Sequence, residues 1–408
     1  MIELTRIDGG VCAPLGFYAN GVHCGMYPDP ERKDLALIMS DSVASAAGVY
    51  TRNLVKGAPI QVTQSHIKDG YASAIICNSG NANTCNVDGP ADAEKMTMMA
   101  GVELKFHSYD VLVASTGVIG VPLELDPIKK AIPELVQGLE ATSEGATRAA
   151  EAIMTTDTVC KQVAFSFEID GRTCHIGGMS KGSGMIHPNM ATMLAFLTTD
   201  VGIMPDLLQE ALSADVEDSF NMISVDGDTS TNDMVLLLAN GQSGAMIAEH
   251  GEAFDAFCEA LAATTQTLAK IMAADGEGAT KLITCSVAHA KTKEDARTVA
   301  KSVISSSLVK SAMFGEDPNW GRILCAIGYS GADLQVNKIG CVLKSSVGEV
   351  EVCLGGAGMN YSEEFAKSIL GEDSIEICVD LNDGEFDATA WGCDLTYEYV
   401  KINGEYRS

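Results

Sequence analysis

Short apolar runs separated by polar loops dominate the first half of the chain. The runs at 34–39, 72–77 and 110–115 are rich in Ala, Val, Leu and Ile, and each leads into small polar residues. Runs of this length and flanking sequence are typical of buried β-strands. Residues 163–169 alternate apolar with polar or small side chains and then meet Asp170-Gly171, a strong signal for a two-residue hairpin turn. The pattern therefore predicts a sheet built from these strands.

Helical periodicity appears in the second half of the chain. Apolar residues between 208 and 223, and again between 254 and 271, recur at three- and four-residue spacing and so fall on one helix face. Thr292-Lys-Glu-Asp295 has the form of a capping box and predicts the start of a third long helix. The last third of the chain predicts further strands, at 339–343, 349–354, 374–381 and 390–402.

The composition is that of a folded protein with a large core. The 408 residues are 46% hydrophobic, 20% charged and only 6% aromatic, which is typical of a soluble globular protein and excludes general disorder. At roughly 150 residues per domain the length allows two or three domains. No repeat, low-complexity tract or Pro/Ser-rich linker interrupts the chain, however. We therefore expect one compact α/β body with its sheets and helices in layers.

The charge balance is strongly acidic. Lys and Arg number 27 and Asp and Glu number 55, which gives a net charge of −28 at pH 7. A surface of this charge repels phosphate backbones and anionic headgroups, so we expect neither nucleic acid nor a membrane as partner. It also repels small carboxylates, so a site for an acidic substrate has to supply its own local cation.

The sequence predicts neither export nor membrane insertion. The first ten residues carry charges where a secretory signal needs an apolar stretch. The longest apolar stretch, 111–123, is interrupted by polar residues, glycines and a proline, and it is shorter than the roughly 20 residues of a membrane span. The 13 cysteines include no C-x-x-C pair and mostly lie in apolar runs, where a reduced thiol packs as a small hydrophobe. These features predict a reducing, cytoplasmic location.

No metal site is predicted. Asp226-Gly-Asp228-Thr-Ser230 begins like a calcium loop but lacks the glycine at its sixth position and the glutamate at its twelfth. The seven histidines show no ligand spacing. Only His187 lies in the glycine-rich segment described next, and we expect it to pack within that loop rather than act as a general base.

The most unusual segment of the chain is 177–196. It has four glycines within eight residues, followed by Pro188-Asn189, yet it lies between hydrophobic sequences. Because these residues disfavour both a helix and a central strand, we expect a long irregular loop here. Irregular segments in such positions are often functional.

Three functional interpretations of this segment compete. Gly178-Met-Ser180-Lys-Gly182 matches the G-x-S-x-G nucleophile elbow, but residues 183–188 cannot open the helix that this motif requires, so we treat the match as coincidental. The second interpretation is a phosphate-binding loop, but no G-x-x-x-x-G-K-[ST] string occurs in the chain. The third interpretation is a nucleophile at Thr192, which follows Ala191 and precedes an apolar run. By residue type alone, a core threonine at a strand edge is the more ordinary interpretation.

The stretch 181–196 resembles the self-cleavage site of the ornithine acetyltransferase family, the glutamate N-acetyltransferases of arginine biosynthesis. Other segments are similar to the same family, in the same order along the chain: 9–17, 49–53, 78–83, 115–120, 154–157, 224–233, 275–281, 317–322 and 403–408. The resemblance therefore spans the whole chain. It departs at Thr84-Cys85-Asn86, where the family usually has Ala-Cys-Thr, and at the final Ser408, where threonine is commoner.

The resemblance implies a layered αββα sandwich with an N-terminal-nucleophile-like architecture. It also implies that the precursor cuts itself between Ala191 and Thr192, which gives an α fragment, 1–191, and a β fragment, 192–408, that remain intertwined. The Thr192 hydroxyl attacks the preceding carbonyl, and water resolves the ester. Cleavage frees an α-amine whose reference pKa, about 7.7–8.0, suits it to accept the hydroxyl proton in catalysis.

The same resemblance implies roles for further residues. The family's oxyanion hole falls at Thr116 and Gly117, which taken alone predict an ordinary turn after a strand. The family's substrate contacts fall at Thr155, Lys181, Thr192, Glu277, Asn403 and Ser408. Lys181 then supplies the cation that the acidic surface makes necessary, and we hypothesise that Glu277 pairs with the ornithine ammonium. The motif around Thr155 is short, so its neighbour Thr156 remains an alternative.

The implied function is acetyl transfer from N2-acetyl-L-ornithine to L-glutamate through an acetyl-Thr192 intermediate. We expect no cofactor, and acetyl-CoA is left open as a second donor. The expected partners are these small molecules, and the expected assembly is a heterotetramer of two α and two β fragments. Two alternatives remain: a related N-terminal-nucleophile amidohydrolase or aminopeptidase, in which water replaces glutamate, and an amino-acid-binding protein that is never cleaved.

Overall fold

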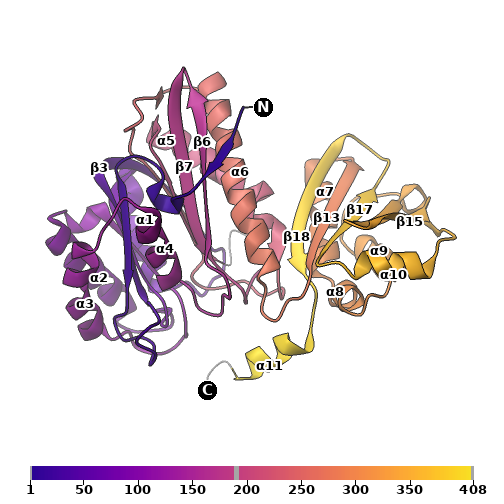
Figure 1. Cartoon of the computed structure of the whole chain (residues 1–408), viewed down its shortest axis with the longest axis horizontal. Helices are drawn as coiled ribbons and strands as arrows, with labels where there is room; N and C mark the ends of the chain where they lie inside the picture. Colours follow the sequence, from indigo (N-terminus) through magenta and orange to yellow (C-terminus); the bar gives the residue numbers. More distant parts are fainter. Residues whose placement is uncertain (1, 188–192, 406–408) are drawn as a thin grey trace. The chain divides into compact units, whose positions relative to one another are not determined.

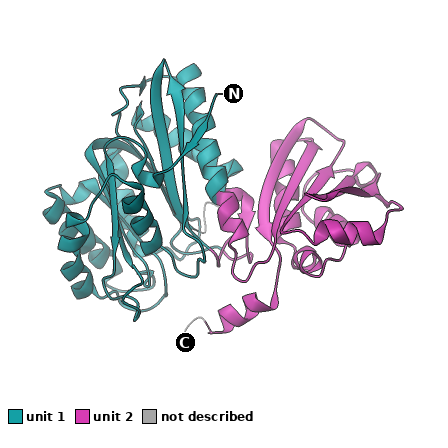
Figure 2. Cartoon of the chain, viewed as in Figure 1, with its two compact units in different colours: residues 1–182, 188–220, 229–268 teal, residues 183–187, 221–228, 269–408 magenta. Residues whose placement is uncertain are grey.

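The computed structural model describes residues 2–187 and 193–405 and divides the chain into two compact units (Figure 2). Unit 1 comprises residues 1–182, 188–220 and 229–268, and unit 2 comprises 183–187, 221–228 and 269–408. Both units are mixed α/β, as expected, but the expectation of one compact body is wrong. The predicted fragments, 1–191 and 192–408, do not coincide with these two units, and the division into fragments stays a prediction.

Unit 1 is built around a mixed sheet that has nine strands among the described residues (Figure 1). Its strands follow in the order β1 (Thr5–Ile7), β6 (Lys161–Ile169), β7 (Arg172–Lys181), β8 (Leu194–Thr199), β11 (Met234–Ala239), β3 (Leu35–Tyr50), β4 (Tyr71–Asn78) and β5 (Val111–Ser115), while β2 (Phe17–Val22) pairs with β3. The three predicted apolar strands are β3, β4 and β5. Strands β8 and β11 follow residue 192 in the chain, yet they lie between β7 and β3, which precede it.

Strand β4 is buried on both faces. Successive side chains of a strand point to opposite sides of the sheet, and each side of β4 faces its own core cluster. Ala74 and Ile76 join a core cluster that includes Met96 of α2 (Gly89–Leu104). Ile75 and Cys77 join a second cluster with α4 (Ser143–Ala152) and with side chains of β7, β8 and β11. With a core on each side, every position needs an apolar residue, which explains the uninterrupted apolar run in the sequence.

Local sequence signals place the hairpin and helices of unit 1. Asp170-Gly171 connects β6 to β7 with positive φ angles of 52° and 72°, as a two-residue turn of this kind requires. The predicted helix at 208–223 is shorter than expected, because α5 (Pro205–Asp215) gives way to 3-10 turns. The remaining α-helices are α1 (Ala58–His66), α3 (Leu125–Gln137) and α6 (Glu252–Ala274). Helix α6 forms as predicted, and its last turns, from residue 269, belong to unit 2. No helix in the described part of the chain is long and apolar enough to cross a membrane.

Strand β7 runs through Gly177 and Gly178, although glycine disfavours the interior of a strand. It continues to Lys181, so the irregular loop expected from residue 177 is wrong over its first five residues. The glycines serve close packing: a Cβ on Gly177 would lie 1.9 Å from the carbonyl oxygen of Gly10, and one on Gly178 would lie 2.5 Å from Leu197. Segment 178–182 is therefore not a strand-to-helix turn, and the nucleophile elbow stays excluded.

Unit 2 contains a sheet that has seven strands among the described residues (Figure 1). Their order is β10 (Ile223–Ser224), β18 (Phe386–Cys393), β13 (Leu282–Ala290), β17 (Ser374–Asp380), β14 (Gly340–Ser345), β15 (Gly348–Leu354) and β16 (Ala357–Gly358). The helices are α7 (Lys293–Ser305), α8 (Ser307–Phe314), α9 (Trp320–Gly328), α10 (Glu363–Leu370) and α11 (Tyr397–Glu405). The predicted start of α7 is confirmed, because the Thr292 side chain accepts the Asp295 N–H as an N-cap.

The predicted strand at 390–402 is only half right. Strand β18 ends at Cys393, and the chain then forms α11. In this helix Tyr397 is 85% exposed and Val400 is 68% exposed, so the apolar residues of the predicted strand are not buried in a sheet here.

Candidate active site

Thr116 and Gly117, the predicted oxyanion hole, lie in the loop that leaves β5 in unit 1. Ser115, the last residue of β5, donates its hydroxyl to Asn78 Oδ1 at 2.6 Å. The main-chain N–H of Thr116 donates to the carbonyl of the same Asn78 at 3.0 Å. The loop is thus fixed to the end of the neighbouring strand β4. Because its N–H is occupied, the hydroxyl is the donor of Thr116 that remains for an oxyanion.

Gly117 occupies a position that only glycine fits. Its φ is 130°, a region that L-residues with a side chain rarely adopt. A Cβ here would lie 2.3 Å from the carbonyl carbon of Gly80 and 2.5 Å from the main-chain nitrogen of Asn81. The absence of a side chain therefore lets two backbone segments lie in contact, and that contact fixes the position of this turn.

Thr155 and Lys181 are connected through a residue that the sequence analysis did not single out, Asp157. One oxygen of Asp157 accepts the Thr155 N–H at 2.9 Å. The other accepts the Gly182 N–H at 2.7 Å and Lys161 Nζ at 2.6 Å. The side chains of Asp157 and Lys161 are fully buried. Two predicted substrate-binding segments of unit 1 therefore meet at one carboxylate.

Two neighbouring ammonium groups stabilise the ionised form of Asp157. Burial raises the pKa of Asp157, but the charges of Lys181 and Lys161 and the hydrogen bonds outweigh it and lower the pKa to about 2. A second carboxyl, Asp233, lies close enough to feel the charge of Lys181, but burial raises its pKa well above the ordinary value. Two ammonium groups thus share one firmly ionised carboxylate. Lys181, which is 8% exposed, fits the local cation that the sequence predicts.

The predicted cleavage point cannot be placed. Ala191 and Thr192 lie outside the described residues, as does Ser408. The strand that follows is described: Leu194 pairs with Lys181 in the antiparallel ladder of β7 and β8, and Met193 is 3% exposed. Lys181 is therefore beside the start of the strand to which Thr192 is joined through Met193.

Glu277 and Asn403 contact each other in unit 2. Asn403 Nδ2 donates to Glu277 Oε2 at 2.6 Å, and the Glu277 N–H donates to the Ser183 carbonyl at 2.9 Å. Glu277 is 6% exposed, and a Cβ on Gly184 would lie 2.3 Å from its carboxylate. The structure thus brings these two predicted substrate-binding residues together. A largely buried carboxylate held by one amide donor is suited to receive an ammonium group.

His187 behaves as a packing residue within unit 2. Its Nδ1 lies 3.0 Å from the Ser224 hydroxyl, and burial, helped by the positive charge of Lys301, lowers its pKa to about 4. It is therefore neutral near pH 7. The nearby Asp226 accepts the N–H groups of Met185 at 2.6 Å and Ile186 at 2.9 Å. The sequence that began like a calcium loop thus provides acceptors for the glycine-rich segment.

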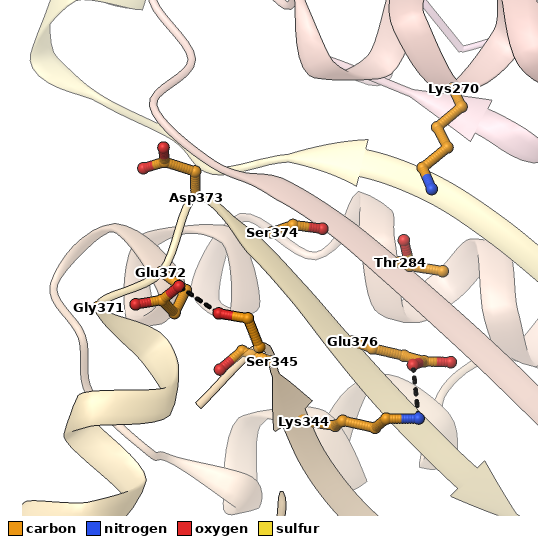
Figure 3. A pocket seen from close by; sticks show the side chains of 10 residues that line it. Lys270, Thr284, Lys344, Ser345, Gly371, Glu372, Asp373, Ser374 and Glu376 are labelled. Carbon is orange, nitrogen blue, oxygen red and sulfur yellow. Dashed lines mark hydrogen bonds and ion pairs between the residues drawn. The ribbon is translucent and has the colours of Figure 1, made fainter. Parts of the chain in front are cut away.

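A pocket of about 600 Å³ lies elsewhere in unit 2, between the C-terminal end of α10 and strands β14 and β17 (Figure 3). Figure 3 shows the ion pair of Lys344 with Glu376 in its lining. Glu372, on the same lining, accepts the hydroxyl of Ser346. Its lining is polar and of mixed charge, and none of the predicted site residues belongs to it. It is therefore separate from the candidate site.

Comparison with known proteins gives consistent matches along the chain. The model of the ArgJ family matches residues 18–408. The arginine biosynthesis bifunctional protein ArgJ of Caldanaerobacter subterraneus is 49% identical over 404 residues, which cover 98% of this chain and 99% of that protein. The protein of the same name from Symbiobacterium thermophilum is 50% identical over 405 residues, with 98% and 99% covered. The crystal structure of ArgJ from Bacillus halodurans, 44% identical with a TM-score of 0.50, matches 52% of this chain and 99% of the crystallised chain.

Proposed function

The chain belongs to the ArgJ family, acyltransferases of arginine biosynthesis, and we propose that it moves the acetyl group of N2-acetyl-L-ornithine to L-glutamate through an acetyl-Thr192 enzyme. The proposal includes self-cleavage between Ala191 and Thr192. It needs no cofactor. The two fragments stay together as one enzyme.

In the proposed cleavage, the Thr192 hydroxyl attacks the Ala191 carbonyl, the peptide C–N bond breaks, and an ester forms. Water hydrolyses that ester and leaves a free Thr192 amine. In each turnover the hydroxyl attacks the acetyl carbonyl of acetylornithine while the amine takes its proton, and the proton passes to the departing ornithine nitrogen. The glutamate amine then attacks the acetyl ester, which regenerates the hydroxyl. Thr116 and Gly117 stabilise the oxyanion of each step.

The charge arrangement supports the choice of substrates. Acetylornithine and glutamate share an α-carboxylate but end in opposite side-chain charges. Lys181, beside the fully ionised Asp157 and the second cation Lys161, offers the positive charge for the shared carboxylate. The buried Glu277 carboxylate, with Asn403 on one oxygen, offers the acceptor for the ornithine ammonium. The largely buried Lys181 of unit 1, which suits the carboxylate that both substrates share, is the observation that carries the substrate assignment.

The solved relative supports cleavage into two chains. The crystallised chain of ArgJ from Bacillus halodurans is matched over 99% of its length by only 52% of this chain. The relatives from Caldanaerobacter subterraneus and Symbiobacterium thermophilum, by contrast, are matched by 98% of this chain. A crystallised chain of about half the length is what a cut precursor produces, and the proposed β fragment, 192–408, is slightly more than half of this chain.

The proposal is tested by trapping the intermediate. Purified protein incubated with N-acetylornithine and no glutamate should gain the mass of one acetyl group on the fragment that begins at Thr192. Adding glutamate should remove that mass and yield N-acetylglutamate. Release of free acetate faster than transfer to glutamate would instead favour an amidohydrolase. An uncut chain that binds ornithine without any acetylated species would favour a binding protein.

Glu277→Gln should raise the KM for N-acetylornithine by roughly tenfold or more, because a charged hydrogen bond to the substrate ammonium becomes a neutral one. The substitution keeps the size of the side chain and an oxygen for Asn403 Nδ2. Separate steady-state titrations of each substrate measure the effect. If the KM for N-acetylornithine stays unchanged while only glutamate is affected, the ammonium contact is not at Glu277.

A further inference from the structure

Asp157 is a buried carboxylate to which the proposed reaction assigns no role. Its side chain is fully buried, and it accepts three hydrogen bonds from three separate positions of unit 1. Two of the donors are main-chain N–H groups, at Thr155 and at Gly182, and the third is Lys161 Nζ. Hydrogen bonds to an ionised carboxylate are stronger than those between neutral groups. Asp157 therefore holds the turn before β6 to the residue after β7, at the open end of the β6–β7 hairpin.

The two segments are those proposed to hold the substrate carboxylate. Thr155 belongs to the turn that precedes β6, and Gly182 follows Lys181, the last residue of β7. The turn is also held from its carbonyl side, because Arg32 donates to the carbonyl of Thr155 at 2.5 Å and stacks over Tyr27. Asp157 thus connects an anchored turn to the segment that carries the cation.

We infer that Asp157 is a positioning residue for substrate binding, which holds the Thr155 hydroxyl and the Lys181 ammonium so that both reach the same α-carboxylate. The inference rests on the proposed substrate contacts of Thr155 and Lys181. Asp157 itself touches no substrate. Its ion pair with Lys161 keeps the carboxylate charged within the core, and that charge in turn orders the two N–H donors.

The shared carboxylate gives the inference a specific kinetic signature. Asp157→Asn keeps one oxygen acceptor but replaces the other with an NH2 group, which cannot accept a main-chain N–H. The variant therefore loses its hydrogen bond to the N–H of either Thr155 or Gly182. We expect the KM values for N-acetylornithine and for glutamate to rise together, each about tenfold, as for a lost hydrogen bond to a charged group. The kcat should change less than about threefold, because Asp157 neither attacks the acetyl group nor transfers a proton in the proposed reaction.

Loss of the buried charge also destabilises the fold. Two further variants separate this effect on stability from the effect on the KM values. As the control for stability alone, Ile128→Ala removes a fully buried side chain of α3 from a core cluster that contains none of the residues around Asp157, so it should lower the melting temperature while the KM values stay within about twofold. Asp157→Asn combined with Lys161→Met removes both charges of the buried pair. Removing both partners is far less costly than removing one. The double variant should therefore regain stability and still show the raised KM values.

All variants are first checked for cleavage on a denaturing gel and for folding by thermal melting. The inference is overturned if Ile128→Ala raises the KM values as much as Asp157→Asn, or if the double variant restores them, since the effect would then follow stability alone. Lys181→Met provides the separate check of the proposed function. If Lys181→Met leaves both KM values unchanged, the substrate assignment fails; if it raises them while Asp157→Asn does not, only the positioning role fails.

Discussion

Thr192→Ala should leave the polypeptide as a single chain of about 42.9 kDa and reduce acetyl transfer below detection. The substitution removes the hydroxyl that performs both the self-cleavage and the attack on acetylornithine, so both activities are lost together. A denaturing gel, followed by mass spectrometry of the bands, measures cleavage. A discontinuous assay of N-acetylglutamate measures transfer in the same preparation.

Thr192→Ser is the matched control for this prediction, because it keeps the hydroxyl and removes only a methyl group. It should still be cut, and it should retain measurable transfer. A Thr192→Ala protein that is cut at the same bond would show that the hydroxyl of another residue breaks it. An uncut Thr192→Ala protein with normal turnover would remove the need for a free amine altogether.

Gly117→Ala should lower kcat by at least a hundredfold. The added Cβ would lie 2.3 Å from the carbonyl carbon of Gly80, so the loop has to move and carries the proposed oxyanion donor with it. Removing one such donor costs about 10²–10³ in kcat. The effect should appear in kcat rather than in KM, because the oxyanion exists only during the reaction. Steady-state kinetics together with thermal melting measure it.

Gly120→Ala serves as the control from the same loop. Gly120 also has a positive φ, 77°, but a Cβ there would meet no atom within 4 Å. The variant carries backbone strain of about 1 kcal/mol without a clash, so it should melt slightly earlier and keep nearly all of its kcat. Equal loss of kcat in both variants would mean that general loop strain, and not the position of the donor, limits the reaction.

The fold was predictable where a signal is local. The Asp170-Gly171 turn and the Thr292 cap each depend on a few adjacent residues, and both occur as predicted. The glycines of β7 were misjudged because their role lies in distant neighbours: Gly177 makes room for the backbone of Gly10. No pattern within 177–182 records that contact. A glycine run therefore signals either a loop or a crowded strand, and only the surrounding structure distinguishes them.

The candidate site shows the same limit. A resemblance identifies Thr155 and Lys181 by their motifs, but spacing does not reveal which neighbouring carboxylate is buried between them. Asp157 lies two residues from Thr155 and twenty-five from Gly182, and the fold alone brings it to both. The pairing of Glu277 with Asn403, 126 residues apart, is likewise a tertiary fact. The chemistry of these residues could be inferred from the sequence, whereas their connection could not.

The interleaving of strands in the unit 1 sheet has a consequence for how a cut protein behaves on denaturation. Strands β8 and β11 of the later fragment are hydrogen-bonded to β7 on one side and to β3 on the other, both from the earlier fragment. Neither polypeptide can rebuild this sheet alone. Recovery from urea should therefore be a bimolecular process for the nicked protein, with a yield that depends on dilution, but unimolecular for the uncut Thr192→Ala chain.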